Sequence, residues 1–145
     1  MKVLLQRVKK ASVKVKETEI SSINNGVLVF VGIHHEDTHI QMKKMVKKIL
    51  ELRFFNDENQ KMNLSCIDTH SDILLVSQFT LYGDCSKGRR PSYIEAAEPK
   101  HAQKLYEEMI KEFKLQYKEI STGQFGAMME VSLINDGPVT LFLNN

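Results

Sequence analysis

Strand-like alternation in the first third of the chain is the feature that most limits its fold. Apolar residues recur at every second position of "KVLLQRV" and "ASVKVKE", with lysines between them: Val3, Leu5, Val13 and Val15. This period is that of a strand with one buried face. A turn at Asn24-Asn25-Gly26 and a continuous apolar run over 27–33 then predict a strand that is buried on both faces.

Two later segments change to the period of a helix. Asp37 or Thr38 can cap the first helix, and Pro99 opens the second. One face of the first helix carries Met42, Met45, Val46, Ile49 and Leu50. The apolar stripe of the second consists of Ala102, Leu105, Tyr106, Met109, Ile110 and Phe113. Both segments are therefore predicted to be amphipathic helices that cover a sheet.

The remaining segments complete the predicted fold. Between the helices, "FFNDENQKMNLS" reads as a polar loop and "DILLVSQFTL" as another buried strand. The end of the chain, "FGAMMEVSLINDGPVTLFL", predicts two more strands. Many strands with two amphipathic helices indicate an α+β fold built on antiparallel β-sheet. A length of 145 residues suits one domain, here 1–145.

Composition and charge exclude several classes of protein. The net charge is +2, so the chain has no strong overall positive field of the kind that marks a nucleic-acid binder. Any RNA contact would have to come from local basic patches. No run approaches the ~20 apolar residues of a membrane span, and the N-terminal apolar stretch is too short for a signal peptide. Cys66 and Cys85 show no CxxC spacing and are interpreted as ordinary thiols. We expect a soluble, cytoplasmic protein with no membrane partner.

The common catalytic signatures are absent: the chain has no GxxxxGK, GxGxxG, GxSxG or HExxH pattern. The segment "IHHEDTH" brings His34, His35 and His39 close together in sequence, which invites a zinc interpretation. Their spacing does not match a helix face, and no second ligand cluster stands elsewhere. The segment is therefore interpreted as a polar loop, and no metal or cofactor is expected.

Two clusters of basic residues are candidate phosphate contacts. Lys87, Arg89 and Arg90 stand in the loop "SKGRRPS", where guanidinium groups can bind a phosphate through two hydrogen bonds. The predicted first helix carries lysines opposite its apolar stripe: Lys43, Lys44, Lys47 and Lys48. For these four lysines a solvated helix face is the favoured interpretation.

Two short stretches are hard to explain as ordinary strands. Ser77, Gln78 and Thr80 interrupt an apolar strand, where buried polar groups need hydrogen-bond partners. In "NDGPVT", Pro138 follows Gly137 directly between two apolar runs, removes an amide donor and fixes its own backbone. Spacing alone leaves open that the first stretch is merely a strand end satisfied by neighbouring loops.

Together, "SQFTL" and "NDGPVT" resemble the two signature motifs of the D-aminoacyl-tRNA deacylase family. Segments such as "RVKKASVKV", "LRFFNDENQKMNLS" and "KGRRPSY" resemble the family as well, in order and over essentially the whole chain. The resemblance implies a barrel-like core covered by two helices. It also implies a hydrolase acting on carboxylic ester bonds, which works as a homodimer without a metal.

The implied reaction is hydrolysis of the ester between a D-amino acid, or mischarged glycine, and the 3′-terminal adenosine of tRNA. This is a chiral proofreading step in translation quality control. The resemblance implies that the Gly137–Pro138 bond is cis and projects into the active site of the partner subunit. Two main-chain carbonyl groups would then exclude the side chain of an L-aminoacyl group, while the side chain of a D residue points away.

The first motif supplies the candidate catalytic residues Ser77, Gln78, Phe79 and Thr80. Thr80 is the side-chain candidate for the nucleophile, with Ser77 behind it, and backbone N–H groups near Phe79 and Thr80 are expected to hold the oxyanion. Because neither motif supplies a base, the favoured interpretation is that the 2′-hydroxyl of the terminal ribose orients or activates the attacking water, with Thr80 as nucleophile the alternative. Expected phosphate contacts are Arg7, Lys87, Arg89 and Arg90.

Two other functions compete with this interpretation. A non-catalytic RNA-binding module would explain the basic loop, but gives no reason for "SQFTL" and the Gly-Pro stretch together. A generic esterase lacks support because GxSxG is absent. The expected partners are therefore D-aminoacyl-tRNA and a second copy of the chain, with no DNA.

Overall fold

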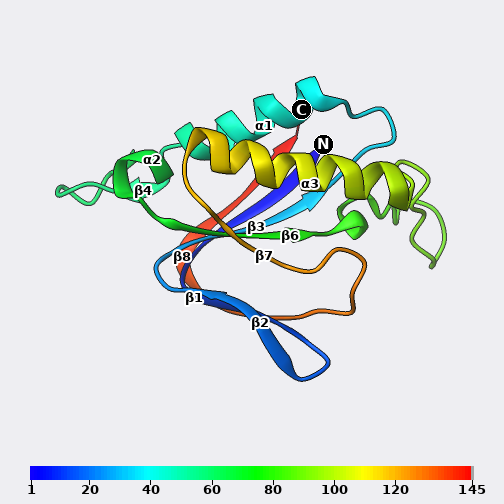
Figure 1. Ribbon diagram of the computed structural model, residues 1–145, viewed down its shortest axis with the longest axis horizontal. Helices are drawn as coiled ribbons and strands as arrows, with labels where there is room; N and C mark the ends of the chain where they lie inside the picture. The colour runs from blue at the N-terminus through cyan, green and yellow to red at the C-terminus, as the bar shows by residue number, and fades with distance from the viewer. Residues whose placement is uncertain (145) are drawn as a thin grey trace.

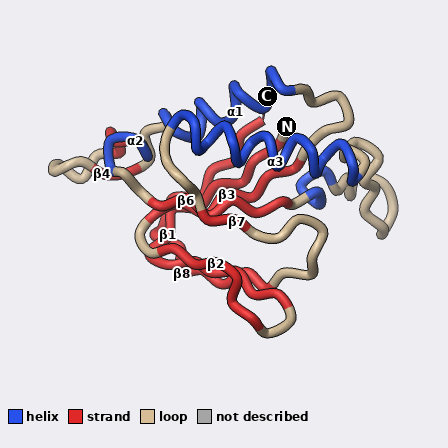
Figure 2. Tube along the Cα trace, in the orientation of Figure 1, coloured by secondary structure: helices blue, strands red, loops and turns tan. Residues whose placement is uncertain are grey.

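Strand β1 (Lys2–Val15) organises the sheet, because it pairs with three other strands. The computed structural model describes residues 1–144. Strand β8 (Glu130–Asn144) runs along one edge of β1, while β3 (Gly26–Gly32) and then β2 (Thr18–Ile23) occupy the other edge. All three pairings are antiparallel, as the alternation predicts. Figure 2 shows these strands beneath the helices.

The sheet is built mainly on antiparallel pairing, as predicted, but two pairings are parallel. Strand β6 (Asp72–Ser77) lies parallel to β3, and β7 (Ser121–Thr122) lies parallel to β6. Helices intervene before β6 and before β7, so each of these two strands enters the sheet in the direction of its neighbour. The spacing of apolar residues shows which face of a strand is buried but not the direction in which the strand runs. The sequence therefore does not reveal these two parallel pairings. The Ser21 hydroxyl donates to Thr122 O at 2.8 Å and brings β2 to β7. The α+β class with a sheet nearly closed into a barrel is confirmed.

Two long helices cover one face of the sheet (Figure 1). Helix α1 (His39–Glu51) is capped by Thr38 in a capping box with Gln41, and α3 (Pro99–Gln116) has Pro99 in its first turn. Both apolar stripes face the core as predicted, with Ile110 half-buried. No helix among residues 1–144 is long and apolar enough to cross a membrane.

Buried side chains form two clusters, and β1 contributes to both. Val3 and Leu5 pack in the larger cluster with α1 and α3. Val8, Ala11 and Val13 join a second cluster with residues of β3, β6 and β8. The pairing of β1 with β8 shifts between Gln6 and Val8, and again between Val8 and Lys10. These irregularities coincide with the change of cluster, because a shift of one residue exchanges the faces of a strand.

The segment predicted as a polar loop holds two short strands. Strands β4 (Phe55–Asn56) and β5 (Met62–Leu64) form a hairpin, and helix α2 (Cys66–Thr69) follows. The Asp57 carboxylate accepts hydrogen bonds from Asn59 N, Lys61 N and Asn63 Nδ2, which close the turn. These bonds, first that from Lys61, lower the pKa of Asp57. Strands of two and three residues are too short for a periodic signal.

The Gly-Pro stretch does not separate two strands as predicted, since β8 pairs with β1 on both sides of it. Gln6 is opposite Thr140, and Val8 is opposite Asn135. Arg7 alone therefore faces the four residues 136–139, which bulge out of the ladder. We call residues 136–139 the Gly-Pro bulge. Its Gly137–Pro138 peptide bond is cis, as the resemblance implies.

Truncation of a fully buried side chain between α1 and the sheet tests the core. Met45 is 0% exposed, so Met45→Ala is expected to lower the free energy of unfolding by about 2–5 kcal/mol, through lost burial and a residual cavity. Urea denaturation followed by circular dichroism measures this. Lys44→Ala on the exposed face of the same helix is the control and should change stability by less than about 0.5 kcal/mol. Equal effects would contradict the packing of α1.

Candidate active site

A cavity of about 790 Å³ opens where β6 ends beside the start of α3. The wall on the β6 side includes Ser77, Gln78, Phe79 and Thr80. Tyr93 and Glu98 come from the segment before α3, while Phe125 and Met128 come from the loop before β8. The other lining residues are largely aliphatic or alanine. The first signature motif therefore lies in a mainly apolar cavity, the usual setting of a ligand site.

The chain leaves the sheet inside this motif. Strand β6 ends at Ser77, Gln78 N donates to Val31 O at 2.7 Å, and the next residues form one turn of 3₁₀-helix, η1 (Phe79–Tyr82). The prediction of a strand through the whole of "DILLVSQFTL" is therefore wrong over its last four residues. The turn places the Gln78 amide against the Thr80 hydroxyl, to which Nε2 donates. In a regular strand the side chains of residues 78 and 80 would lie on the same face of the sheet, separated by two residue rises along the strand.

The Thr80 hydroxyl has no base beside it in the described part of one protomer. Its only hydrogen-bond partner among residues 1–144 is the Gln78 amide, which does not remove a proton at neutral pH. The titratable side chains of the cavity wall are those of Tyr93 and Glu98, and neither contacts Thr80 or Ser77 by a hydrogen bond within the described residues. The geometry therefore gives the motif groups that bind and orient, but no activated nucleophile.

Two backbone N–H groups at the start of η1 are available to a ligand. The first N–H groups of a helix have no acceptor within it. Neither Phe79 N nor Thr80 N donates to another group in the described part of the chain. Phe79 and Thr80 are also exposed, with Phe79 at 57%. These donors can therefore face an oxygen that carries developing negative charge.

Arg7 does not lie where a phosphate could reach it, so its expected role as a tRNA contact is corrected. The side chain is buried, at 7% exposure. Its Nη1 donates to Phe54 O at 2.6 Å, and its Nε lies 2.7 Å from Asp136 Oδ2 in an ion pair. Arg7 therefore holds the Gly-Pro bulge against the body of the protein. Sequence reasoning cannot separate a buried guanidinium from an exposed one.

Hydrogen bonds hold the two ends of the Gly-Pro bulge, whereas the residues at its tip, Gly137 and Pro138, are open to solvent. Asn135 Nδ2 donates to Arg7 O at 2.8 Å and to Val139 O at 3.1 Å, and Thr140 Oγ1 donates to Asn135 Oδ1 at 3.2 Å. Gly137 and Pro138 are exposed. A Cβ atom added at Gly137 would meet no heavy atom within 4 Å. The tip is therefore free to contact another molecule.

The bulge does not line the cavity of its own chain. It lies opposite Arg7 on β1, and Arg7 in turn pairs with Val27 on β3. Val31, which lines the cavity and pairs with Ser77 of β6, is four residues further along β3. Strands β1 and β3 and roughly 13 Å of strand length thus separate the two signature motifs. Within one protomer they do not form one site.

The basic loop begins and ends at the cavity. It follows η1 and returns to Tyr93, and backbone bonds between Asp84 and Ser92 close it at 2.8 and 2.9 Å. Its three basic side chains, those of Lys87, Arg89 and Arg90, are exposed. None of them forms an ion pair within residues 1–144. These charges are therefore available beside the cavity mouth.

Other reactive side chains are excluded from the chemistry by burial. Desolvation raises the pKa of the Cys66 thiol to about 12, so the thiol remains protonated and unreactive. Burial, together with Asp37 and Glu95, also raises the pKa of Tyr82, which stays a neutral phenol.

The sequence did not indicate four of the cavity residues, which are Tyr93, Glu98, Phe125 and Met128. They come from irregular segments, whose approach to β6 has no periodic signal.

Comparison with known proteins identifies the family. A family described as D-Tyr-tRNA(Tyr) deacylase matches residues 4–144. A "D-aminoacyl-tRNA deacylase" of Thermosipho africanus (strain TCF52B) is 52% identical over all of this chain and 97% of the relative, and one of Clostridioides difficile (strain 630) is 50% identical over the same shares. The chain belongs to the D-Tyr-tRNA(Tyr) deacylase family. The enzyme class expected from its motifs, a hydrolase, is thereby confirmed.

Two solved structures share this fold. A chain described as "c-Myc DNA Unwinding Element Binding Protein" has a TM-score of 0.95 and 41% identity, and the match covers 100% of this chain and 99% of that one. A second, described as "Structural Analysis of a probable eukaryotic D-amino acid tRNA deacylase", has a TM-score of 0.87 and 17% identity, over 98% of this chain and 97% of that one. The second likeness concerns the fold alone.

The burial of Arg7 gives a test that separates support of the bulge from RNA binding. Arg7→Met removes the partner of Phe54 O and Asp136, and is expected to lower the free energy of unfolding by about 1–3 kcal/mol in urea denaturation. The affinity for tRNA should keep its salt dependence, because no phosphate contact is lost. Arg89→Ala is the matched control, with unchanged stability and a shallower salt dependence. The reverse pattern would contradict the assignment.

Proposed function

We propose that this chain is a chiral proofreading enzyme, which hydrolyses the ester between a D-amino acid and the 3′-terminal adenosine of tRNA. The observation that carries the proposal is that all four residues of "SQFT" line one cavity in a chain of the deacylase family. The matched span of 4–144 supports a single catalytic domain. We infer a cytoplasmic location, where aminoacyl-tRNA is used.

In the proposed reaction the tRNA assists its own hydrolysis. Thr80 lacks a base, so its hydroxyl is a weak nucleophile, and Gln78 already occupies one of its lone pairs. The 2′-hydroxyl of the terminal ribose is adjacent to the ester in any aminoacyl-tRNA, and it orients or activates the attacking water. The protein contributes by positioning the ester, with Thr80, Ser77 and Gln78 as polar contacts.

The oxyanion of the tetrahedral intermediate is assigned to the N–H groups of Phe79 and Thr80. These donors belong to a rigid turn and have no acceptor within residues 1–144. A mainly apolar cavity strengthens such hydrogen bonds, because little water competes for the developing charge. This arrangement accelerates hydrolysis without an ionisable catalytic side chain.

The chiral gate is assigned to the Gly-Pro bulge of a second copy of the chain. The bulge is exposed, lies away from the cavity of its own protomer and is fastened by Asn135 and Arg7. In a two-fold dimer each bulge can enter the cavity of the other subunit. Carbonyl oxygens of Gly137 and Pro138 would then occupy the space of an L side chain, so an L-aminoacyl group is rejected by exclusion.

Two surface features support such a dimer. The outer edge of β8 pairs with no strand of residues 1–144, which leaves unpaired backbone groups along an edge. Large apolar side chains are also exposed on β8, with Ile134 at 57% and Phe142 at 55%. A partner that covers β8 removes both from water and brings the bulge of each subunit to the other.

A gate that works by exclusion also sets the range of substrates. It makes no contact with the side chain of a D residue, so many D-amino acids should be accepted. Glycine has no side chain to exclude, and mischarged glycine should also be cleaved. The exposed charges of Lys87, Arg89 and Arg90 are assigned to phosphates of the acceptor end of the tRNA. No DNA contact is proposed.

Activity with matched substrates tests the reaction. D-Tyr-tRNA should be deacylated at least ~10²-fold faster than L-Tyr-tRNA, and a D-substrate that ends in 2′-deoxyadenosine should lose at least ~10²-fold in rate. Thr80→Ala should keep activity within ~10²-fold, since Thr80 only positions the ester. Release of labelled amino acid measures all three. A loss beyond ~10³-fold in Thr80→Ala, with the deoxy substrate unaffected, would assign Thr80 as nucleophile instead.

Mixing two variants tests whether the gate acts between subunits. Gly137→Val places a side chain where the substrate is proposed to lie, and should reduce D-Tyr-tRNA cleavage by ~10²-fold with an unchanged melting temperature, because no atom surrounds this position within the protomer. A double variant, Gln78→Ala with Thr80→Ala, damages the cavity instead. A mixed dimer of the two keeps one intact cavity facing one intact bulge, so mixing should restore activity. No recovery in verified mixed dimers would refute the proposed exchange.

A further inference from the structure

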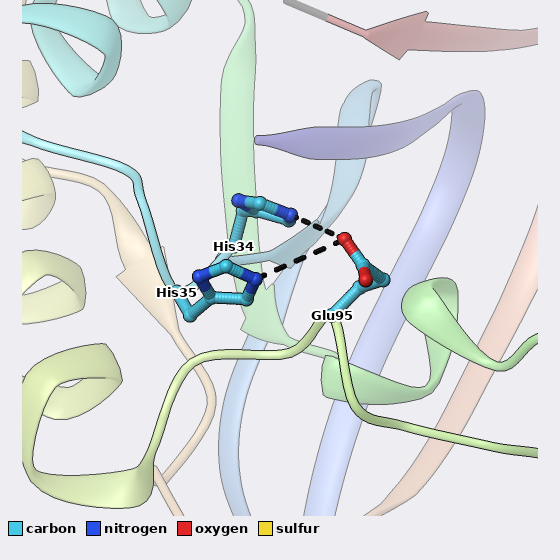
Figure 3. Close-up of side chains that lie close together, drawn as sticks. All are labelled: His34, His35 and Glu95. Carbon is cyan, nitrogen blue, oxygen red and sulfur yellow. Dashed lines mark hydrogen bonds and ion pairs between the residues drawn. The ribbon is translucent and has the colours of Figure 1, made fainter.

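A second cluster of functional groups lies at the end of β3, outside the proposed active site. His34 and His35 follow this strand, and Glu95 stands on the segment that precedes α3 (Figure 3). A β-bridge joins His34 to Ala96, and His35 N donates to Glu95 O at 3.2 Å. The sequence showed only the histidines. The fold supplies the carboxylate from sixty residues further along the chain.

The three side chains converge on one point. His34 Nε2 lies 2.8 Å from Glu95 Oε2, and His35 Nε2 lies 3.9 Å from the same oxygen. One ligand atom from each residue can be chosen so that all three lie within 4.8 Å of one another. The two imidazole rings stack with centroids 4.1 Å apart. Figure 3 shows both rings directed toward the carboxylate.

The backbone explains why two adjacent histidines face the same way. Neighbouring residues of a regular strand point to opposite faces of the sheet. Here the chain turns directly after β3, since Asp37 N donates to His34 O at 3.1 Å and the buried Asp37 carboxylate accepts from His34 N at 2.7 Å. The turn is fixed from inside the protein, so the ring positions are set before any ligand binds.

We propose that His34, His35 and Glu95 bind one divalent transition-metal ion, with Zn²⁺ as the ion that best fits them. Two imidazole nitrogens and one carboxylate oxygen are a usual zinc ligand set, which leaves a fourth position for water. Ligand atoms of a tetrahedral zinc site lie about 3.3 Å apart. The distances of 2.8 and 3.9 Å bracket this value, so small side-chain rotations complete the site.

Glu36 provides a supporting contact for His34. His34 Nδ1 accepts from Glu36 N at 3.2 Å and lies 4.0 Å from Glu36 Oε2. In the chain without an ion, Nε2–H donates to Glu95. When zinc takes the Nε2 lone pair, the ring proton resides on Nδ1, so the bond from Glu36 N is released and the Glu36 carboxylate can rotate to accept that proton. A carboxylate that orients a metal-binding histidine in this way is a common feature of zinc sites.

An ordinary surface ion pair explains less of the geometry. His39 and Glu108 form such a pair elsewhere, with one histidine and one carboxylate at 3.2 Å. Exposed pairs of this kind contribute little to stability. A pair between His34 and Glu95 would leave no role for the stacked His35 ring, whose Nε2 points at the same oxygen.

Binding of the ion would fasten one wall of the cavity. Ala97 N donates to Ile33 O at 2.9 Å, next to the cluster, and Tyr93, Ala96 and Ala97 line the cavity. An ion bound by the histidines after β3 and by Glu95 before α3 would therefore restrain the segment that carries these cavity residues. The ion would not contact the reacting ester, so the inference stands independently of the proposed reaction.

Metal titration of the untagged, chelator-treated chain tests the site. Calorimetry with Zn²⁺ should show one ion per chain at micromolar affinity or tighter, and Co²⁺ should give the visible absorption of a tetrahedral site. His35→Ala and Glu95→Gln should each weaken binding by at least ~10-fold. Both side chains are substantially exposed, at 45% and 59%, so these variants should fold. His39→Ala is the matched control and should bind as the unaltered chain does.

Hydrogen exchange provides a second measurement. Zn²⁺ should slow exchange of the His35 and Ala97 amides, which donate across the bridge, and should not do so in Glu95→Gln. The proposal is overturned if the unaltered chain binds no ion at these concentrations. It is equally overturned if binding persists undiminished in both His35→Ala and Glu95→Gln, because the ion would then be held elsewhere.

Discussion

The pairing of β1 with β8 is the constraint on which the rest of the structure depends. Every peptide group of a central strand needs a partner on each side, and β1 obtains these from β8 along one edge and from β3 and β2 along the other. The Gly-Pro bulge interrupts this ladder where the inward face of β1 changes from the helix cluster to the second cluster. One irregularity therefore both shapes the sheet and presents Gly137 and Pro138 at the surface.

The candidate site combines parts that are individually simple. A strand ends at Ser77, one helical turn follows, and a mainly apolar cavity surrounds the polar groups. No base lies beside the Thr80 hydroxyl in the described residues of one protomer, so the groups present there are suited to positioning and to hydrogen bonds with developing charge. Such a site suits a substrate that carries its own hydroxyl next to the bond to be broken.

The sequence predicted those features that depend on local pattern. Both helices, their buried faces and the Thr38 cap follow from periodicity and capping, and the two motifs follow from resemblance. The parallel pairing of β6, the burial of Arg7 and the meeting of Glu95 with His34 all depend on contacts between distant segments. No local signal distinguishes a buried arginine from a solvated one, or tells which carboxylate a loop will bring to a histidine.

The bridge between Asp84 and Ser92 separates two properties of the enzyme. It closes the basic loop on itself, so residues 85–91 can change in length or charge without displacing η1 or Tyr93. Substitutions of Lys87, Arg89 or Arg90 would then change the charge presented beside the cavity while the residues of η1 that line it keep their positions.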